Sequence, residues 1–75
     1  MRFSYNKLWK ILIDNGMLKK DLATKANITT TTMAKMGKDM PVSMETLGRI
    51  CVALNCNIGD IVDVIIENTK EAQNA

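Results

Sequence analysis

The sequence predicts a compact all-α domain of five helices, with a short β pairing between the chain ends as the one open addition. Apolar residues recur at spacings of three and four residues in five separate segments, the pattern of helices that bury one face. Residues that begin or end helices, chiefly serine, threonine, asparagine and glycine, lie between these segments. The 75 residues contain neither an internal repeat nor a linker, so one small domain is expected.

The first two expected helices are separated by a glycine turn. The first follows Ser4 as its N-cap, and Asn15-Gly16 ends it because glycine adopts the left-handed conformation easily. Its buried face is expected to contain Tyr5, Leu8, Trp9, Leu12 and Ile13. The second covers residues 19–26, with Leu22, Ala23 and Ala26 on one face. Asn27 follows and can take the left-handed conformation that a tight turn between helices needs.

Four consecutive threonines, residues 29–32, begin the third expected helix, although β-branched residues are mediocre helix formers. Thr29 is placed as the N-cap, where its hydroxyl satisfies free backbone amides. Met33 and Met36 supply an inward face, with Ile28 ahead of them. Helix propensity therefore does not explain why four threonines occur here, and the chemistry of their side chains needs a separate explanation.

The fourth and fifth expected helices form the second half of the domain. After a break at residues 37–41, Ser43 caps a helix over residues 44–54, and Asn55 ends it. Its apolar face is expected to hold Leu47, Ile50, Cys51 and Leu54. Asn57 caps the fifth helix, with Asp60 three residues later as in a capping box. Its apolar face would hold Ile58, Ile61, Val62, Ile65 and Ile66, with Val64 off that face.

An alternative remains open for the end of the fifth helix. The β-branched run of residues 62–66 can instead form a short strand, and residues 1–3 can pair with it. The remaining residues have no apolar periodicity, so a flexible tail is expected over residues 68–75, after a domain of residues 1–67.

The formal net charge is only +2, but its sign is distributed unevenly along the chain. Residues 1–56 contain nine Lys or Arg and four Asp or Glu, whereas residues 57–75 contain one and four. Five lysines lie between Lys19 and Lys38, together with a single acid, Asp21. Such a local excess of positive charge is typical of a surface that binds a polyanion.

Composition argues against several other classes of protein. The chain has no histidine, no Gly-rich phosphate loop and no paired carboxylates, and its serines are explained as helix caps, so we expect no enzyme. Cys51 and Cys56 cannot complete a four-ligand zinc site, so free thiols, no metal and no cofactor are expected. With no secretory signal and no membrane-length apolar run, the expected location is cytoplasmic without membrane contact. So small a core offers no argument for a small-molecule effector.

The second and third helices together have the spacing of a helix-turn-helix over residues 19–38. The residues that would bury the pair and form its turn are Leu22, Ala23, Ala26, Asn27, Ile28, Met33 and Met36. With the methionines inward, the outward stripe consists of Thr30, Thr31, Ala34 and Lys35. These short or flexible side chains would let the helix enter a DNA major groove, where a threonine can hydrogen-bond a base and touch a thymine methyl.

The segments MLKKDLATKANITTTTMAKMGK and PVSMETLGRICVALNCNIGDIV resemble the phage Cro and repressor type of helix-turn-helix, the XRE-like transcription regulators. With the first helix, the resemblance covers nearly the whole chain and implies a lambda-repressor-like DNA-binding domain. By position, the family pattern implies phosphate contacts at Lys19 and Thr29, base-edge contacts at Thr30, Thr31 and Lys35, and positions near the DNA backbone for Thr32 and Lys38.

The chain departs from the family pattern at a few positions. Asn27 replaces the usual turn glycine, and Lys19 stands where glutamine is common. Met33 and Met36 replace stiffer β-branched or aromatic anchors. These differences indicate a softer core and a more electrostatic anchoring of the DNA backbone.

The resemblance implies a sequence-specific transcription regulator whose recognition helix, residues 29–36, lies in the major groove of double-stranded DNA. One domain makes few contacts, so a homodimer that binds two half-sites is expected. Candidate dimer surfaces are residues 1–3, the Val64/Ile66 region and part of the fifth helix. The alternative is a protein-interaction module, an antirepressor or antitoxin-like partner that keeps the fold but binds another protein.

Overall fold

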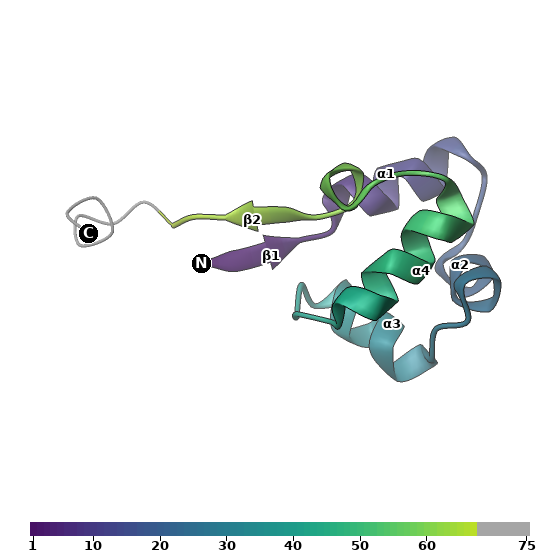
Figure 1. The fold of residues 1–75 in the computed structure, drawn as a ribbon, viewed down its shortest axis with the longest axis horizontal. Helices are drawn as coiled ribbons and strands as arrows, with labels where there is room; N and C mark the ends of the chain where they lie inside the picture. The colour runs from purple at the N-terminus through teal and green to yellow at the C-terminus, as the bar shows by residue number, and fades with distance from the viewer. Residues whose placement is uncertain (68–75) are drawn as a thin grey trace.

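The computed structural model describes residues 1–67 as four α-helices, one short 3₁₀ turn and two short strands (Figure 1). In chain order the elements are β1 (Arg2–Ser4), α1 (Asn6–Asp14), α2 (Lys19–Ala26), α3 (Thr30–Gly37), α4 (Met44–Leu54), η1 (Ile58–Asp60) and β2 (Asp63–Ile65). The predicted bounds of α2 and α4 are confirmed. The tail expected over residues 68–75 lies outside the described part of the chain.

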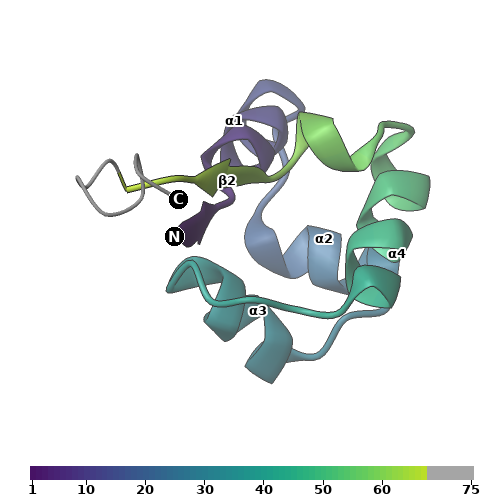
Figure 2. The same ribbon diagram turned by 60° about the vertical axis from the view of Figure 1, so that its left-hand side comes forward.

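The helical body and a β arm are the two parts of the molecule. The strands β1 and β2 pair antiparallel, with Phe3 opposite Val64, and project from the side of the body (Figure 1). The helix α3 lies at the outer edge of the helical cluster in both ribbon views (Figures 1 and 2). None of the helices within residues 1–67 is both long and apolar enough to cross a membrane.

The expected fifth helix is wrong, and so is the count of five helices. Only η1 (Ile58–Asp60) is helical there, where the Asn57 amide donates to Asp60 Oδ2 at 2.9 Å as in the expected capping box. After Ile61 the chain extends into β2, which is the alternative left open by the sequence. The β-branched residues favour extended backbone, and β1 supplies the hydrogen-bonding partner that a short strand needs.

The core lies between the four helices and the segment that follows α4. Its buried apolar side chains are Tyr5, Leu8, Leu12, Leu22, Ala26, Met33, Met36, Leu47, Ile50 and Ile61. Each of the four helices contributes two of these side chains. This packing fixes α2 and α3 relative to the rest of the domain.

The start of α1 differs from the prediction. Ser4 belongs to β1 and Tyr5 occupies the N-cap, although the Ser4 hydroxyl still accepts the Asn6 amide at 3.3 Å. The Tyr5 ring is buried, and its hydroxyl donates to the Met40 carbonyl oxygen at 2.8 Å. Burial, and then the negative charge of Asp39, raise the pKa of Tyr5. Tyr5 therefore ties the start of α1 to the loop after α3.

Ile13 is also placed wrongly by the periodicity. It is 76% exposed, whereas Leu8 and Leu12 are buried and Ile11 is half-buried. The buried face of α1 is centred on Leu8 and Leu12, and Ile13, five residues after Leu8, falls beyond its edge.

All four helices end in the same way. A residue in the left-handed conformation follows each helix, and the next amide donates to a carbonyl five residues earlier, as in a Schellman motif. The left-handed residues are Gly16, Asn27, Asp39 and Asn55. The sequence predicted the turns at Gly16, Asn27 and Asn55, but it left Asp39 inside an unassigned break. Asparagine and aspartate are the non-glycine residues that adopt this conformation most readily.

Candidate nucleic-acid interface

The helix-turn-helix is formed by α2, a turn over residues 27–29, and α3. Asn27 has φ 56° and ψ 55°, which confirms the predicted left-handed turn. The Ile28 amide donates to the Ala23 carbonyl oxygen at 2.8 Å and so closes the end of α2. Leu22 and Ala26 are buried, and Ala23 and Ile28 are half-buried. The predicted inward residues of α2 therefore hold this pair of helices against the core.

The two faces of α3 are sharply different. Met33 is 8% exposed and Met36 is fully buried, which confirms the predicted inward face. The opposite stripe, Thr30, Thr31, Ala34 and Lys35, is exposed. An exposed stripe of small and flexible side chains at the edge of the body gives α3 a surface that a DNA groove can approach (Figure 2).

Two of the predicted site residues, Thr29 and Thr32, form the N-terminal cap of α3. The Thr29 hydroxyl accepts the Thr32 amide at 3.1 Å, so Thr29 is the N-cap as predicted. It also donates to Thr32 Oγ1 at 3.0 Å, and Thr32 is only half-exposed. Thr32 therefore supports the cap, and its hydroxyl is less free than those of Thr30 and Thr31.

Lys19, the first residue of α2, contacts α1 and lies near the end of α3. Its Nζ lies 4.3 Å from the centroid of the Trp9 ring on α1, a cation–π contact. A side-chain carbon at Gly37, the last residue of α3, would lie 3.9 Å from the same Nζ. The half-buried Trp9 ring also packs edge-on to Tyr5, with centroids 6.4 Å apart. Lys19 is exposed, but its ammonium rests against the protein and near the end of α3.

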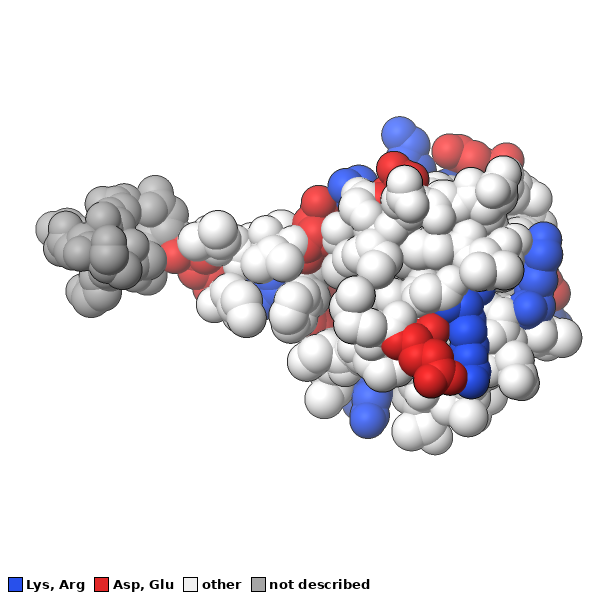
Figure 3. Space-filling view, in the orientation of Figure 1, with Lys and Arg blue, Asp and Glu red and all other residues white. Residues whose placement is uncertain are grey.

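The remaining predicted lysines carry positive charge at the end of α3. Lys35 lies in the last turn of the helix and Lys38 directly follows it, and both are exposed. Within residues 1–67, the three ion pairs involve the Met1 amino group, Lys7 and Arg49, so none uses a lysine between Lys19 and Lys38. On the face in Figure 3, basic and acidic side chains both lie on the helical body, and further acidic ones lie along the arm and at its root.

A family comparison agrees with this geometry. The family model of the Cro/C1-type helix-turn-helix DNA-binding domain matches residues 7–67. The chain belongs to this family. This domain is also similar to the crystal structure of the transcriptional regulator VanUg, form II, with 47% sequence identity and a TM-score of 0.84. The match covers 88% of each chain. A search of curated proteins finds no match.

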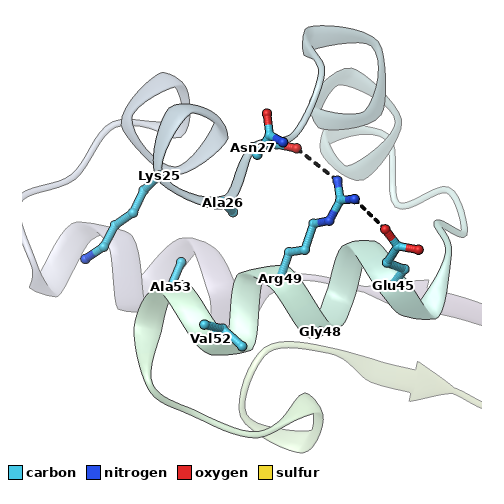
Figure 4. A pocket seen from close by; sticks show the side chains of 8 residues that line it. All are labelled: Lys25, Ala26, Asn27, Glu45, Gly48, Arg49, Val52 and Ala53. Carbon is cyan, nitrogen blue, oxygen red and sulfur yellow. Dashed lines mark hydrogen bonds and ion pairs between the residues drawn. The ribbon is translucent and has the colours of Figure 1, made fainter.

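Arg49 is the residue near the site of this Cro/C1-type domain that sequence reasoning missed. Its Nη1 donates to the Asn27 carbonyl oxygen at 3.2 Å, and its Nη2 pairs with Glu45 (Figure 4). It thereby links α4 to the turn of the helix-turn-helix. The pairing of Glu45 with Arg49 could be predicted from their spacing of four residues in a helix. The contact of Arg49 with Asn27 could not be predicted, because it depends on how α4 packs on α2.

A shallow groove lies beside Arg49, between α2 and α4 (Figure 4). Its volume is about 590 Å³, and it is lined by Lys25, Ala26, Asn27, Glu45, Gly48, Arg49, Val52 and Ala53. Within residues 1–67, no three Cys, Asp or Glu side chains are grouped to hold a metal ion, and both cysteines are free thiols. Among the features described, the strongest candidate for function is therefore the exposed stripe of α3 with its surrounding lysines.

Proposed function

We propose that this domain is a sequence-specific transcription regulator that inserts α3 into the major groove of double-stranded DNA. The observation that carries the proposal is the division of α3, which buries Met33 and Met36 and exposes Thr30, Thr31 and Lys35. Membership of the Cro/C1-type family and the similarity to a transcriptional regulator support it. Bound protein would act by occupancy, by blocking or adjusting access of RNA polymerase in the cytoplasm.

Base recognition is assigned to Thr30, Thr31 and Lys35. A threonine hydroxyl donates or accepts, its methyl can contact thymine, and a lysine ammonium donates to the acceptors of guanine. All three side chains are exposed on one stripe of the helix. Their different chemistry would let the helix discriminate between base pairs rather than bind any duplex.

Attachment to the DNA backbone is assigned to Lys19, Thr29, Thr32 and Lys38. Lysines neutralise phosphates, and hydroxyls at a helix N-terminus donate to phosphate oxygens. For Lys19, this requires the ammonium to leave the Trp9 ring, 4.3 Å away. Cation–π contacts at exposed sites are worth about 0.5–1 kcal/mol, so a phosphate can compete for this lysine.

The active species is proposed to be a homodimer. A single small domain bound through a few phosphates has a Kd of roughly 10⁻⁴–10⁻⁶ M at physiological salt, too weak for a specific site. Two copies reading half-sites about one helical turn apart would overcome this limit. The exposed apolar side chains of the arm, Met1 (80%), Val64 (55%) and Ile66 (73%), support the arm as the dimer contact.

Selection of bound sequences from a random duplex library tests the proposal directly. Two related half-sites with two-fold symmetry and centres about 10 base pairs apart are expected. Recovery of one unrepeated half-site would contradict the dimer but keep the recognition helix. Recovery of no enriched sequence would contradict sequence-specific binding.

A charge reversal on α3 tests the role of the helix. Lys35→Glu is expected to weaken operator binding by roughly 100-fold, because it removes a base contact and places a carboxylate against DNA. Lys25→Glu is the matched control: it makes the same charge change on exposed α2 surface, and less than about tenfold loss is expected. Affinity is measured by fluorescence anisotropy over a series of salt concentrations, and folding by circular dichroism.

The same pair of variants separates DNA binding from the protein-interaction alternative. If α3 reads DNA, Lys35→Glu also reduces the slope of log affinity against log salt concentration. Equal losses in Lys35→Glu and Lys25→Glu would place the recognition surface elsewhere. Unchanged DNA affinity in both variants would favour a domain that uses α3 to bind another protein.

A further inference from the structure

The C-terminal cap of α4 brings two thiols together. Asn55 is left-handed, and the Cys56 amide donates to the Cys51 carbonyl oxygen at 3.0 Å, so α4 ends in a Schellman motif. In this motif the side chains of the two hydrogen-bonded residues commonly touch. At the other helix ends the corresponding pairs are Leu12 and Met17, Ala23 and Ile28, and Lys35 and Met40. Only α4, among the helices of residues 1–67, has a cysteine at both positions.

The backbone of this cap is compatible with a covalent bond between the two residues. With standard bond lengths, a 3.0 Å bond from the Cys56 amide to the Cys51 carbonyl keeps their Cα atoms within roughly 7 Å. Disulfides need Cα atoms about 4.4–6.8 Å apart. Both side chains are half-buried free thiols, so a small thiol reagent can reach them.

The electrostatics of the pair agree with direct contact. Burial raises the pKa of the Cys56 thiol, and the charge of Cys51, a hydrogen bond with the Cys51 side chain and the charge of Asp60 raise it further. The reduced form therefore gains no stability from a thiolate. A disulfide is a strong oxidant when a stabilised thiolate favours its reduced form, and this pair has the opposite character. Its disulfide should accordingly resist reduction.

We propose that Cys51 and Cys56 are a modification site that closes reversibly to an intramolecular disulfide across the end of α4. A low-molecular-weight disulfide such as oxidised glutathione is the oxidant. One protein thiolate attacks it, and the glutathione S–S bond breaks to release one glutathione thiolate. The second protein thiolate then attacks the protein sulfur of the mixed disulfide and releases the other. The two protein thiols lose two protons and two electrons, and one oxidised glutathione becomes two reduced molecules.

Closure would lock the cap of α4 without touching the proposed DNA surface. The end of α4 lies on the side of the body away from α3 in both ribbon views (Figures 1 and 2). The disulfide constrains the unfolded chain, so the thermal midpoint is expected to rise by roughly 5–15 °C, with DNA affinity unchanged. The inference is thus independent of the proposed function.

The test uses the wild-type domain equilibrated in glutathione buffers of graded composition, with and without 8 M urea. Acid quenching, alkylation and mass spectrometry then count free thiols, closed disulfide and glutathione adducts. If the fold positions the pair, half-closure in the native domain occurs at a buffer at least about tenfold more reducing than in urea. Cys51→Ser and Cys56→Ser should instead accumulate the single glutathione adduct.

Two outcomes of the thiol assay would overturn the proposal. One is half-closure at the same buffer composition in native and unfolded protein, which would mean that only proximity in sequence matters. The other is a native protein that carries glutathione on each cysteine without the closed form, which would mean that the cap holds the sulfur atoms apart. A fall in the thermal midpoint on closure would contradict the expected stabilisation of the cap.

Discussion

Single residues in the left-handed conformation determine where this chain changes direction. The three non-glycine examples are Asn27, Asp39 and Asn55, and each immediately follows or lies within two residues of a helix end. A positive φ is unfavourable for most residues, because Cβ clashes with the backbone. The short polar side chains of asparagine and aspartate reduce this cost. Asn27 is the most consequential, because the angle between α2 and α3 depends on it.

Replacing Asn27 tests this reasoning at the residue scale. Asn27→Ala is expected to destabilise the domain by about 1 kcal/mol, because alanine has no local compensation for a φ of 56°. Asn27→Gly should be close to neutral, since glycine adopts this conformation freely. The Arg49 contact uses the Asn27 carbonyl oxygen, so both variants keep it. Urea unfolding measures the difference, and equal stability of the two variants would contradict the backbone explanation.

At the scale of elements, local signals predicted the helices well and the strands incompletely. The bounds of α2 and α4 follow from caps and apolar spacing alone, since Asn27, Ser43 and Asn55 act within a few residues of themselves. The end of the chain could not be settled in this way. The choice between a fifth helix and β2 depends on pairing with β1, about 60 residues earlier in the chain.

The candidate site, too, can be predicted from the sequence only in part. The exposed stripe of α3 is predictable, because it is the face opposite Met33 and Met36. The positions of Lys19 over Trp9 and of Arg49 beside Asn27 are not, because each depends on how separate helices pack. Motif spacing can therefore predict which residues belong to a site. It cannot predict the conformations of their side chains, because these depend on tertiary contacts.

The N-cap of α3 provides a prediction at the element scale. Thr29→Ala is expected to cost about 1 kcal/mol of stability, because the Thr32 amide loses its 3.1 Å acceptor. Thr29→Ser keeps a hydroxyl and should retain most of the stability. Thermal unfolding without DNA measures this effect apart from any phosphate contact. If serine is no better than alanine, the hydroxyl is not what stabilises the start of α3.

At the scale of the whole molecule, an extended arm projects from a helical body of a small domain (Figure 3). The principal extents are 43, 24 and 18 Å, and a two-stranded ribbon is marginally stable by itself. Exposed apolar patches often mark a surface that binds another protein. The arm is therefore the surface that we propose as the dimer contact.

Charge placed on the arm should separate the proposed dimer into monomers. Val64→Glu puts a carboxylate on a side chain that is 55% exposed, and Ile66→Glu does so beyond the strand pairing at 73% exposure. Because a dimer contact would desolvate these carboxylates, both variants should shift the sedimentation equilibrium towards monomer. Binding to a two-half-site operator should weaken at least about tenfold, while binding to a single half-site changes little.

The matched control is Val52→Glu, at a valine of α4 that is 84% exposed. It introduces the same charge on the body and should leave both the mass in solution and the operator affinity unchanged. Ile66→Glu controls for unfolding of the arm, because Ile66 lies outside the β1–β2 pairing, whereas Val64 pairs with Phe3. Dissociation by Val52→Glu alone would move the contact to the α2–α4 side of the body. Unchanged mass in all three variants would leave the arm without a role in assembly.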